Sequence, residues 1–184
     1  MTACEDVLAP LESVPLSDLL ILALQSGAPA APTDSRWIRA GEPTTQVISL
    51  QHADDFNTLF AEVRFPSGSL RALNGTPLTS SDSVLVTVQP MAGRYGVTLS
   101  PSGLEFSGTA APTVRFAYGR YGDFTVADGS PTYADPTDYA AALDVWREAT
   151  LSRWQVAAAS GPTGTDAIGA SVGAPGGFLV AAPR

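Results

Sequence analysis

The feature that most constrains this chain is a succession of short segments in which apolar and polar residues alternate. The clearest is SVLVTVQP at 83–90, which places Val84, Val86 and Val88 on one face before Pro90 ends it. Alternation with a period of two is typical of a strand whose two faces have different surroundings. Further segments of this kind lie at 45–51, 60–65, 96–106, 113–119, 143–148, 153–160, 166–173 and 176–183. Short strands repeated in this way predict a mainly β chain that folds as an antiparallel β-sandwich.

Turn signals separate these segments, and the alternation indicates which side chains face the core. Asn74-Gly75 is a hairpin signal, because both residues tolerate the positive φ of a tight two-residue turn. In the segment 60–65 we expect Val63 and Phe65 to face the core. In 113–119 the residues expected on one face are Val114, Phe116 and Tyr118.

The stretch DPTDYAAALDVWREATLSRW at 135–154 permits two interpretations. It contains good helix formers and could form a helix that begins near Thr137. We favour a strand at 143–148, because the flanking residues alternate and the segment 153–160 can pair with it as a hairpin after a short turn.

The first third of the chain predicts a separate extension. Leu16–Leu24 is an apolar stretch that Ser17 could cap and Gly27 could end, so we expect a short helix there. A Pro/Ala-rich linker follows, and we place the domain boundary near Asp34, with a tether at 1–33 and the β-sandwich at 34–184. No apolar run reaches the ~18–20 residues that a membrane-spanning helix requires.

The only cysteine, Cys4, follows Thr2 and Ala3. These three residues resemble the last positions of the lipobox of bacterial lipoproteins, although Met1 stands where an aliphatic residue is usual. The resemblance implies that Cys4 is the first mature residue and carries diacylglycerol on its sulfur. Several acyl chains together make a firm membrane anchor. The alternative is an ordinary thiol near the chain end. Acidic residues directly after the lipidated cysteine, here Glu5 and Asp6, slightly favour the inner membrane.

Three later segments carry a second resemblance, which extends from Phe60 to Pro183. They are FPSGSL at 65–70, LSPSGLEFS at 99–107 and LDVWREATLSRWQV at 143–156. In this order they are similar to segments of the bacterial relatives of the ZU domain, the β-sandwich of ankyrins, netrin receptors and tight-junction scaffolds. The stretch at 121–139 has no counterpart in that family. The resemblance implies an Ig-like or ZU-like sandwich that binds other proteins and carries no catalytic residues.

Charge argues against a nucleic-acid partner. The chain has a net charge of −8, and its ten basic residues are scattered arginines. Phosphate contacts need clustered Lys or Arg, so we expect no nucleic-acid binding.

No residue pattern indicates catalysis, a metal or a cofactor. His52 is the only histidine, and with Asp54 and Asp55 it is interpreted as a surface turn, because one histidine cannot supply a common zinc site. The loop at 128–138 could bind calcium through its aspartates, but its spacing is not that of an EF-hand. We therefore expect a protein that is not an enzyme and has no cofactor.

Loops rich in Tyr and Arg are the candidate binding surface. The tetrapeptide GRYG occurs at 93–96 and again at 119–122. Exposed Tyr and Arg are preferred anchors of protein interfaces, although these tyrosines could instead close the ends of the core. The candidate partner-binding residues are Arg94, Tyr95, Arg120, Tyr121, Phe124 and Tyr133.

These observations together predict an envelope lipoprotein on the periplasmic side of a membrane. We expect it to serve as an accessory or stabilising subunit of a membrane-bound complex, bound to lipid through Cys4 and to membrane protein subunits through its loops. The alternative is a carbohydrate- or peptidoglycan-binding module. That alternative needs an exposed aromatic platform, and Trp37, Trp146 and Trp154 lie in alternating segments where we expect them to be buried.

Overall fold

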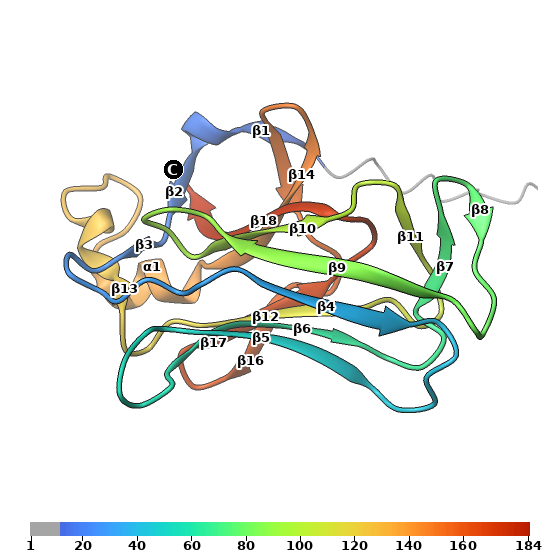
Figure 1. Ribbon diagram of the computed structural model, residues 1–184. Coiled ribbons are helices and arrows are strands. Elements are labelled where there is room, and N and C mark those ends of the chain that lie inside the picture. The colour runs from blue at the N-terminus through green and yellow to red at the C-terminus, as the bar shows by residue number, and fades with distance from the viewer. Residues whose placement is uncertain (1–11) are drawn as a thin grey trace, which may run out of the picture.

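The computed structural model describes residues 12–184 and is mainly β, with its strands arranged in antiparallel sheets (Figure 1). The larger sheet has eight strands: β1 Val14–Pro15, β2 Leu19–Ile21, β4 Asp34–Arg39, β9 Ser83–Pro90, β10 Gly96–Ser100, β14 Asp144–Thr150, β15 Arg153–Val156 and β18 Gly176–Pro183. The second sheet has five strands: β5 Gln46–Gln51, β6 Leu59–Phe65, β12 Thr113–Ala117, β16 Gly161–Gly164 and β17 Ala167–Ser171.

Smaller elements lie at the two ends of the molecule. One end holds a three-stranded sheet of β7 Leu70–Leu73, β8 Thr76–Pro77 and β11 Leu104–Phe106 (Figure 1). The opposite end holds α1 Pro136–Ala141, the 3-10 helix η2 Phe124–Ala127, and the paired strands β3 Ala23–Leu24 and β13 Gly122–Asp123.

The core forms between the two large sheets, as the alternation predicted. Val84, Val86 and Val88 of β9 are buried and belong to the same apolar cluster as Val63 and Phe65 of β6. Val114, Phe116 and Tyr118 are buried in that cluster as well. The predicted sandwich-like arrangement is therefore present, with one continuous core between two antiparallel layers.

The turn chemistry also agrees with the sequence. Asn74 and Gly75 have φ values of 52° and 76°, and they join β7 to β8 in register Leu73 to Thr76. Both central residues of this two-residue turn are left-handed, as a hairpin with the normal strand twist requires.

The ambiguous stretch contains both a helix and a strand. The helix α1 begins after Asp135, whose side chain accepts hydrogen bonds from the backbone N–H groups of Thr137 and Asp138 at 2.7 and 3.0 Å. It ends at Ala141, and β14 follows and pairs with β15, with Trp146 opposite Val156. The predicted strand and hairpin are thus confirmed. The helix-forming residues that precede the strand form one short helix, α1.

The predicted helix at Leu16–Leu24 is wrong. Only Leu16–Asp18 forms a single 3-10 turn, and the strands β2 and β3 follow it. The strand β18 pairs with β10 at residues 176–179 and with β2 at residues 181–183. In the sheet the backbone of this segment has hydrogen-bond partners that an isolated short helix lacks. Leu19 and Leu22 pack on opposite faces of the sheet.

The structure shows no domain boundary near Asp34, because β1 and β2 lie before it and pair with β15 and β18 of the eight-stranded sheet. Val14 of β1 pairs with Trp154 of β15, and Leu19 packs in a second apolar cluster against Trp146 and Trp154. This second cluster lies on the face of the eight-stranded sheet turned away from the main core. Residues 1–11, including Cys4, lie outside the described part of the chain. Within residues 12–184 no helix is long and apolar enough to cross a membrane.

Candidate functional site

The loop between β5 and β6 is organised by one carboxylate. Asp54 accepts hydrogen bonds from the backbone N–H groups of Phe56 and Thr58, at 3.2 and 3.0 Å, and from the Thr58 hydroxyl at 2.6 Å. These donors, the Thr58 hydroxyl first, hold the pKa of Asp54 well below its ordinary value of 3.8. The loop is therefore held in one conformation by an ionised side chain.

A second loop, distant in sequence, docks on this one. The Tyr121 hydroxyl donates to Asp54 Oδ2 at 2.9 Å. The guanidinium carbon of Arg120 lies 4.2 Å from the centre of the Phe56 ring, at a distance typical of a cation–π pair. Phe56 is 69% exposed, and Arg120 is exposed too. We call the four residues Asp54, Phe56, Arg120 and Tyr121 the end-loop cluster.

The structure thus brings together two of the predicted partner-binding residues, Arg120 and Tyr121. Phe56 was not predicted as part of a site. The available signal was an aromatic residue between polar ones in a turn, DDFNT at 54–58, where a buried position is not expected.

His52 is not on the surface, and its interpretation as part of a surface turn is wrong. Only 2% of the residue is exposed, and its ring packs edge-on against Phe60 and Tyr121. Nδ1 lies 2.7 Å from the carbonyl oxygen of Pro29, so Nδ1 carries the proton and donates. The register between β5 and β6 shifts after Leu50, and the consecutive residues Phe60 and Ala61 are both fully buried.

Tyr95 is buried as well, which contradicts its prediction as a partner-binding residue. Its ring stacks on Phe60 with 5.2 Å between the ring centres. Burial raises the pKa of Tyr95 far above its ordinary value. Within residues 12–184 its hydroxyl has no hydrogen-bond partner. Tyr95 therefore closes the end of the core, which is the alternative that the sequence left open.

Phe124 and Tyr133 are half-buried members of one aromatic row. Phe124 packs edge-on against Tyr118 and Tyr139, and Tyr133 packs against Tyr139. The Tyr133 hydroxyl also donates to the carbonyl oxygen of Pro183. Both residues fasten η2 and α1 to the sandwich, and neither belongs to the end-loop cluster.

The repeated GRYG segments have a shared structural role. The N–H of Leu24 donates to the Gly93 carbonyl at 3.0 Å, and the N–H of Gln25 donates to the Tyr121 carbonyl at 2.9 Å. The two repeats thus hold the strand β3 between them, with Ala23 bridged to Arg94. Arg94 itself is half-exposed and lines a surface hollow formed with the segment 16–21.

Trp37 is 63% exposed, which contradicts the expectation that all three tryptophans are buried. It lies opposite Leu85, itself 44% exposed, on the outward face of β4 and β9. Trp146 and Trp154 are buried as expected.

The aspartates of the loop at 128–138 do not converge. Asp135 is occupied as the N-cap of α1, where the two N–H groups hold its pKa below the ordinary value. Among residues 12–184 no group of three His, Cys, Asp or Glu residues could hold a metal ion.

No family model, no curated protein and no solved structure matches this chain.

Proposed function

We propose that this chain is a non-catalytic interaction module of the cell envelope. In this account the acylated Cys4 holds it at a membrane, and the end-loop cluster docks on a protein subunit of a membrane-bound complex. The exposed Phe56–Arg120 pair is the observation that carries the proposal. An aromatic ring and an arginine are the side chains most often dominant in protein interfaces.

The rigidity of the cluster supports this role. Asp54 fixes the loop that carries Phe56, and Tyr121 ties that loop to the one that carries Arg120. Because both anchors are ordered before binding, association costs less conformational entropy than it does from mobile loops.

A pull-down from gently solubilised membranes tests the docking. We expect the chain to recover a defined membrane protein and the double variant Phe56→Ala/Arg120→Ala to lose it, with an affinity at least ~30-fold lower, as for an interface hot spot. Leu151→Ala is the matched control, because Leu151 is 91% exposed on a different loop. Equal recovery by the double variant, or recovery of the free chain alone, contradicts the proposal.

We further propose that the sandwich is of the ZU-like type. The support comes from two segments that carry the resemblance, FPSGSL and LSPSGLEFS. Near its C-terminal end, each segment enters one of two neighbouring strands of the same sheet. β7 pairs with β11, and the rings of Phe65 and Phe106 lie 6.3 Å apart.

A carbohydrate-binding function is a second candidate, which the exposed Trp37 favours. Trp37 lies on the same sheet face as Ser35 and Thr87, whose hydroxyl oxygens are 2.7 Å apart. A flat aromatic face with neighbouring hydrogen-bonding groups suits a sugar ring. If this function is correct, peptidoglycan fragments should change the fluorescence of Trp37, and Trp37→Ala should abolish co-sedimentation with insoluble peptidoglycan. Unchanged fluorescence and sedimentation would exclude it.

A further inference from the structure

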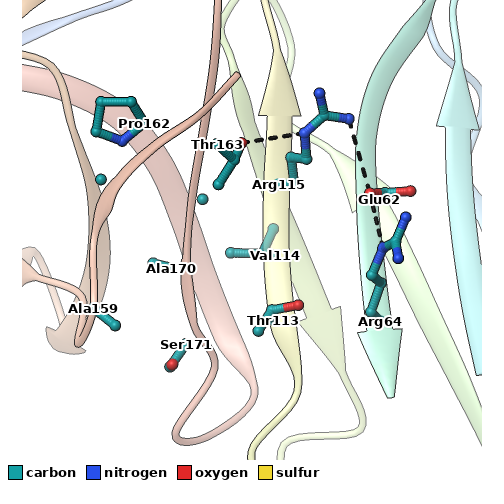
Figure 2. A pocket seen from close by; sticks show the side chains of 12 residues that line it. Glu62, Arg64, Thr113, Val114, Arg115, Ala159, Pro162, Thr163, Ala170 and Ser171 are labelled. Carbon is teal, nitrogen blue, oxygen red and sulfur yellow. Dashed lines mark hydrogen bonds and ion pairs between the residues drawn. The ribbon is translucent and has the colours of Figure 1, made fainter. Parts of the chain in front are cut away.

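A groove of about 520 Å³ lies on the outward face of the five-stranded sheet (Figure 2), and no residue of the end-loop cluster lines it. It crosses four adjacent strands, β6, β12, β17 and β16. One cross-strand row forms its centre, in the order Glu62, Arg115, Gly169 and Gly161. Its size falls within the range of small-ligand sites.

Glu62 is the fixed point of this groove. It is 8% exposed although it lies on the outward face of the sheet, and Oε1 accepts from Arg64 Nε at 3.0 Å. Arg115 Nη1 lies 3.9 Å from the same oxygen. Arg115 Nε also donates to the Thr163 hydroxyl at 3.2 Å, so Arg115 is held from both sides (Figure 2). A buried carboxylate held in this way orients two guanidinium groups before any ligand arrives.

Two glycines, Gly161 and Gly169, line the base of the groove. A Cβ on Gly169 would lie 2.8 Å from the Val114 carbonyl oxygen, closer than real contacts allow. Gly161, in the same row, has open space where its Cβ would lie. Two consecutive positions of the row beside Arg115 therefore carry no side chain, which leaves room for a ligand above the backbone.

The local charge is positive in an acidic protein. Two guanidinium groups face one carboxylate here, whereas the whole chain has a net charge of −8. Each guanidinium presents five N–H donors in a planar fork, and the contacts above use only part of them. The unmatched single positive charge suits a ligand group with one negative charge and planar geometry.

We propose that this groove binds the carboxylate group of a small ligand through the N–H groups of Arg64 and Arg115 that Glu62 leaves unused. The carboxylate matches the planar fork and neutralises the one excess charge. A phosphate dianion would bring a second negative charge next to Glu62. The ligand is either a free small carboxylate or the C-terminal carboxylate of a peptide, since both present the same group.

Titrations followed by amide chemical shifts of Gly161, Gly169 and Arg115 test this site. The probes are acetate, N-acetyl-trialanine with a free carboxylate, its C-terminal amide, and inorganic phosphate. We expect saturable shifts with the two carboxylates and none with the amide. Equal affinity for both carboxylates identifies a small free ligand, and tighter binding of the tripeptide identifies a peptide C-terminus. Binding of the amide, tighter binding of phosphate, or no binding overturns the proposal.

Two single substitutions distinguish direct contacts between arginine and the ligand from long-range attraction between opposite charges. Arg64→Gln should weaken carboxylate binding about 10- to 100-fold, the weight of one charge-assisted hydrogen bond. Arg71→Gln removes the same charge at an exposed position outside the groove and should leave binding unchanged. Equal losses in both variants would overturn the proposal, because they would indicate long-range charge alone.

A second pair of variants keeps the test independent of folding. Arg115→Gln alone leaves Glu62 buried without part of its pairing, so Glu62→Gln/Arg115→Gln removes both charges together. Gly161→Leu keeps every charge and places a side chain in the groove. Both variants should retain the circular dichroism of the parent and lose the saturable shifts. Folded variants that still bind the carboxylate would refute the site.

Discussion

At the scale of single residues, Asp54 makes the hydrogen bonds that hold the two loops of the end-loop cluster together. Its carboxylate accepts from two backbone N–H groups and two hydroxyls, which come from its own loop and from Tyr121. The charged form is stabilised by all four donors, so the pKa of Asp54 lies below its ordinary value in the folded chain. The position of Phe56 under Arg120 therefore depends on the ionisation of one neighbouring side chain.

This coupling predicts a pH-dependent contribution to stability. Because the folded-state pKa is lowered, the contribution is complete above the ordinary value of 3.8 and is lost as the pH falls below it. Asp54→Asn should lower the melting temperature at neutral pH, and the gap from the parent should narrow below about pH 4. Thermal unfolding over a series of pH values measures this gap.

Asp55→Asn is the control, because Asp55 is the exposed neighbour in the same loop. We expect it to leave the melting temperature nearly unchanged. A gap for Asp54→Asn of the same size at neutral and at acid pH would show that its charge does not stabilise the loop.

At the scale of elements, the segment 12–24 determines how the sheet is completed. β2 extends the pairing of β18 beyond the end of β10, and Leu22, the residue that follows β2, is fully buried in the main core. Leu22→Ala should lower the free energy of unfolding by about 2–5 kcal/mol, as is usual for a truncated core leucine. Urea denaturation followed by tryptophan fluorescence measures it.

Leu151→Ala serves as the matched substitution for Leu22→Ala. Leu151 is 91% exposed, so its truncation should change stability by less than about 0.5 kcal/mol. If Leu22→Ala were equally mild, the segment 12–24 would be a loose tether after all.

Strands with a periodic signal of their own could be predicted from the sequence, whereas β4, β7 and β16 were not. Val84, Val86 and Val88 identify the inward face of β9 without reference to the rest of the chain, and Asn74-Gly75 determines a turn locally. The segment at 16–24 has no such signal, because a short apolar run suits a helix and a buried strand equally.

The candidate site depends on contacts between distant residues, which no local pattern reports. Trp37 and Ile38 are adjacent in β4, and one of them must face outward. Only the pairing with β9 decides that Ile38 is buried and Trp37 exposed. His52 is likewise buried among residues distant in sequence, Pro29 and Tyr121. Arg120 was predictable as an interface residue, but its partner Phe56 lies more than sixty positions away.

At the scale of the whole molecule, the proposed anchor and the proposed docking surface are far apart in the sequence. Cys4→Ser tests the anchor in a chain exported by a bacterial host with a lipoprotein signal sequence. The unchanged chain should incorporate labelled palmitate and sediment with membranes, and Cys4→Ser should do neither, because Cys4 is the only cysteine of the sequence. Labelling that persists in Cys4→Ser contradicts lipid attachment at this residue.

The central claim is that the end-loop cluster contacts a protein partner, and crosslinking in intact cells tests it most directly. A photoreactive phenylalanine analogue at position 56 keeps the aromatic ring under Arg120, and the same analogue at position 151 samples a remote exposed site. We predict one defined adduct with a membrane protein from position 56 and none from position 151. No adduct from position 56, or the same adducts from both positions, would contradict the account.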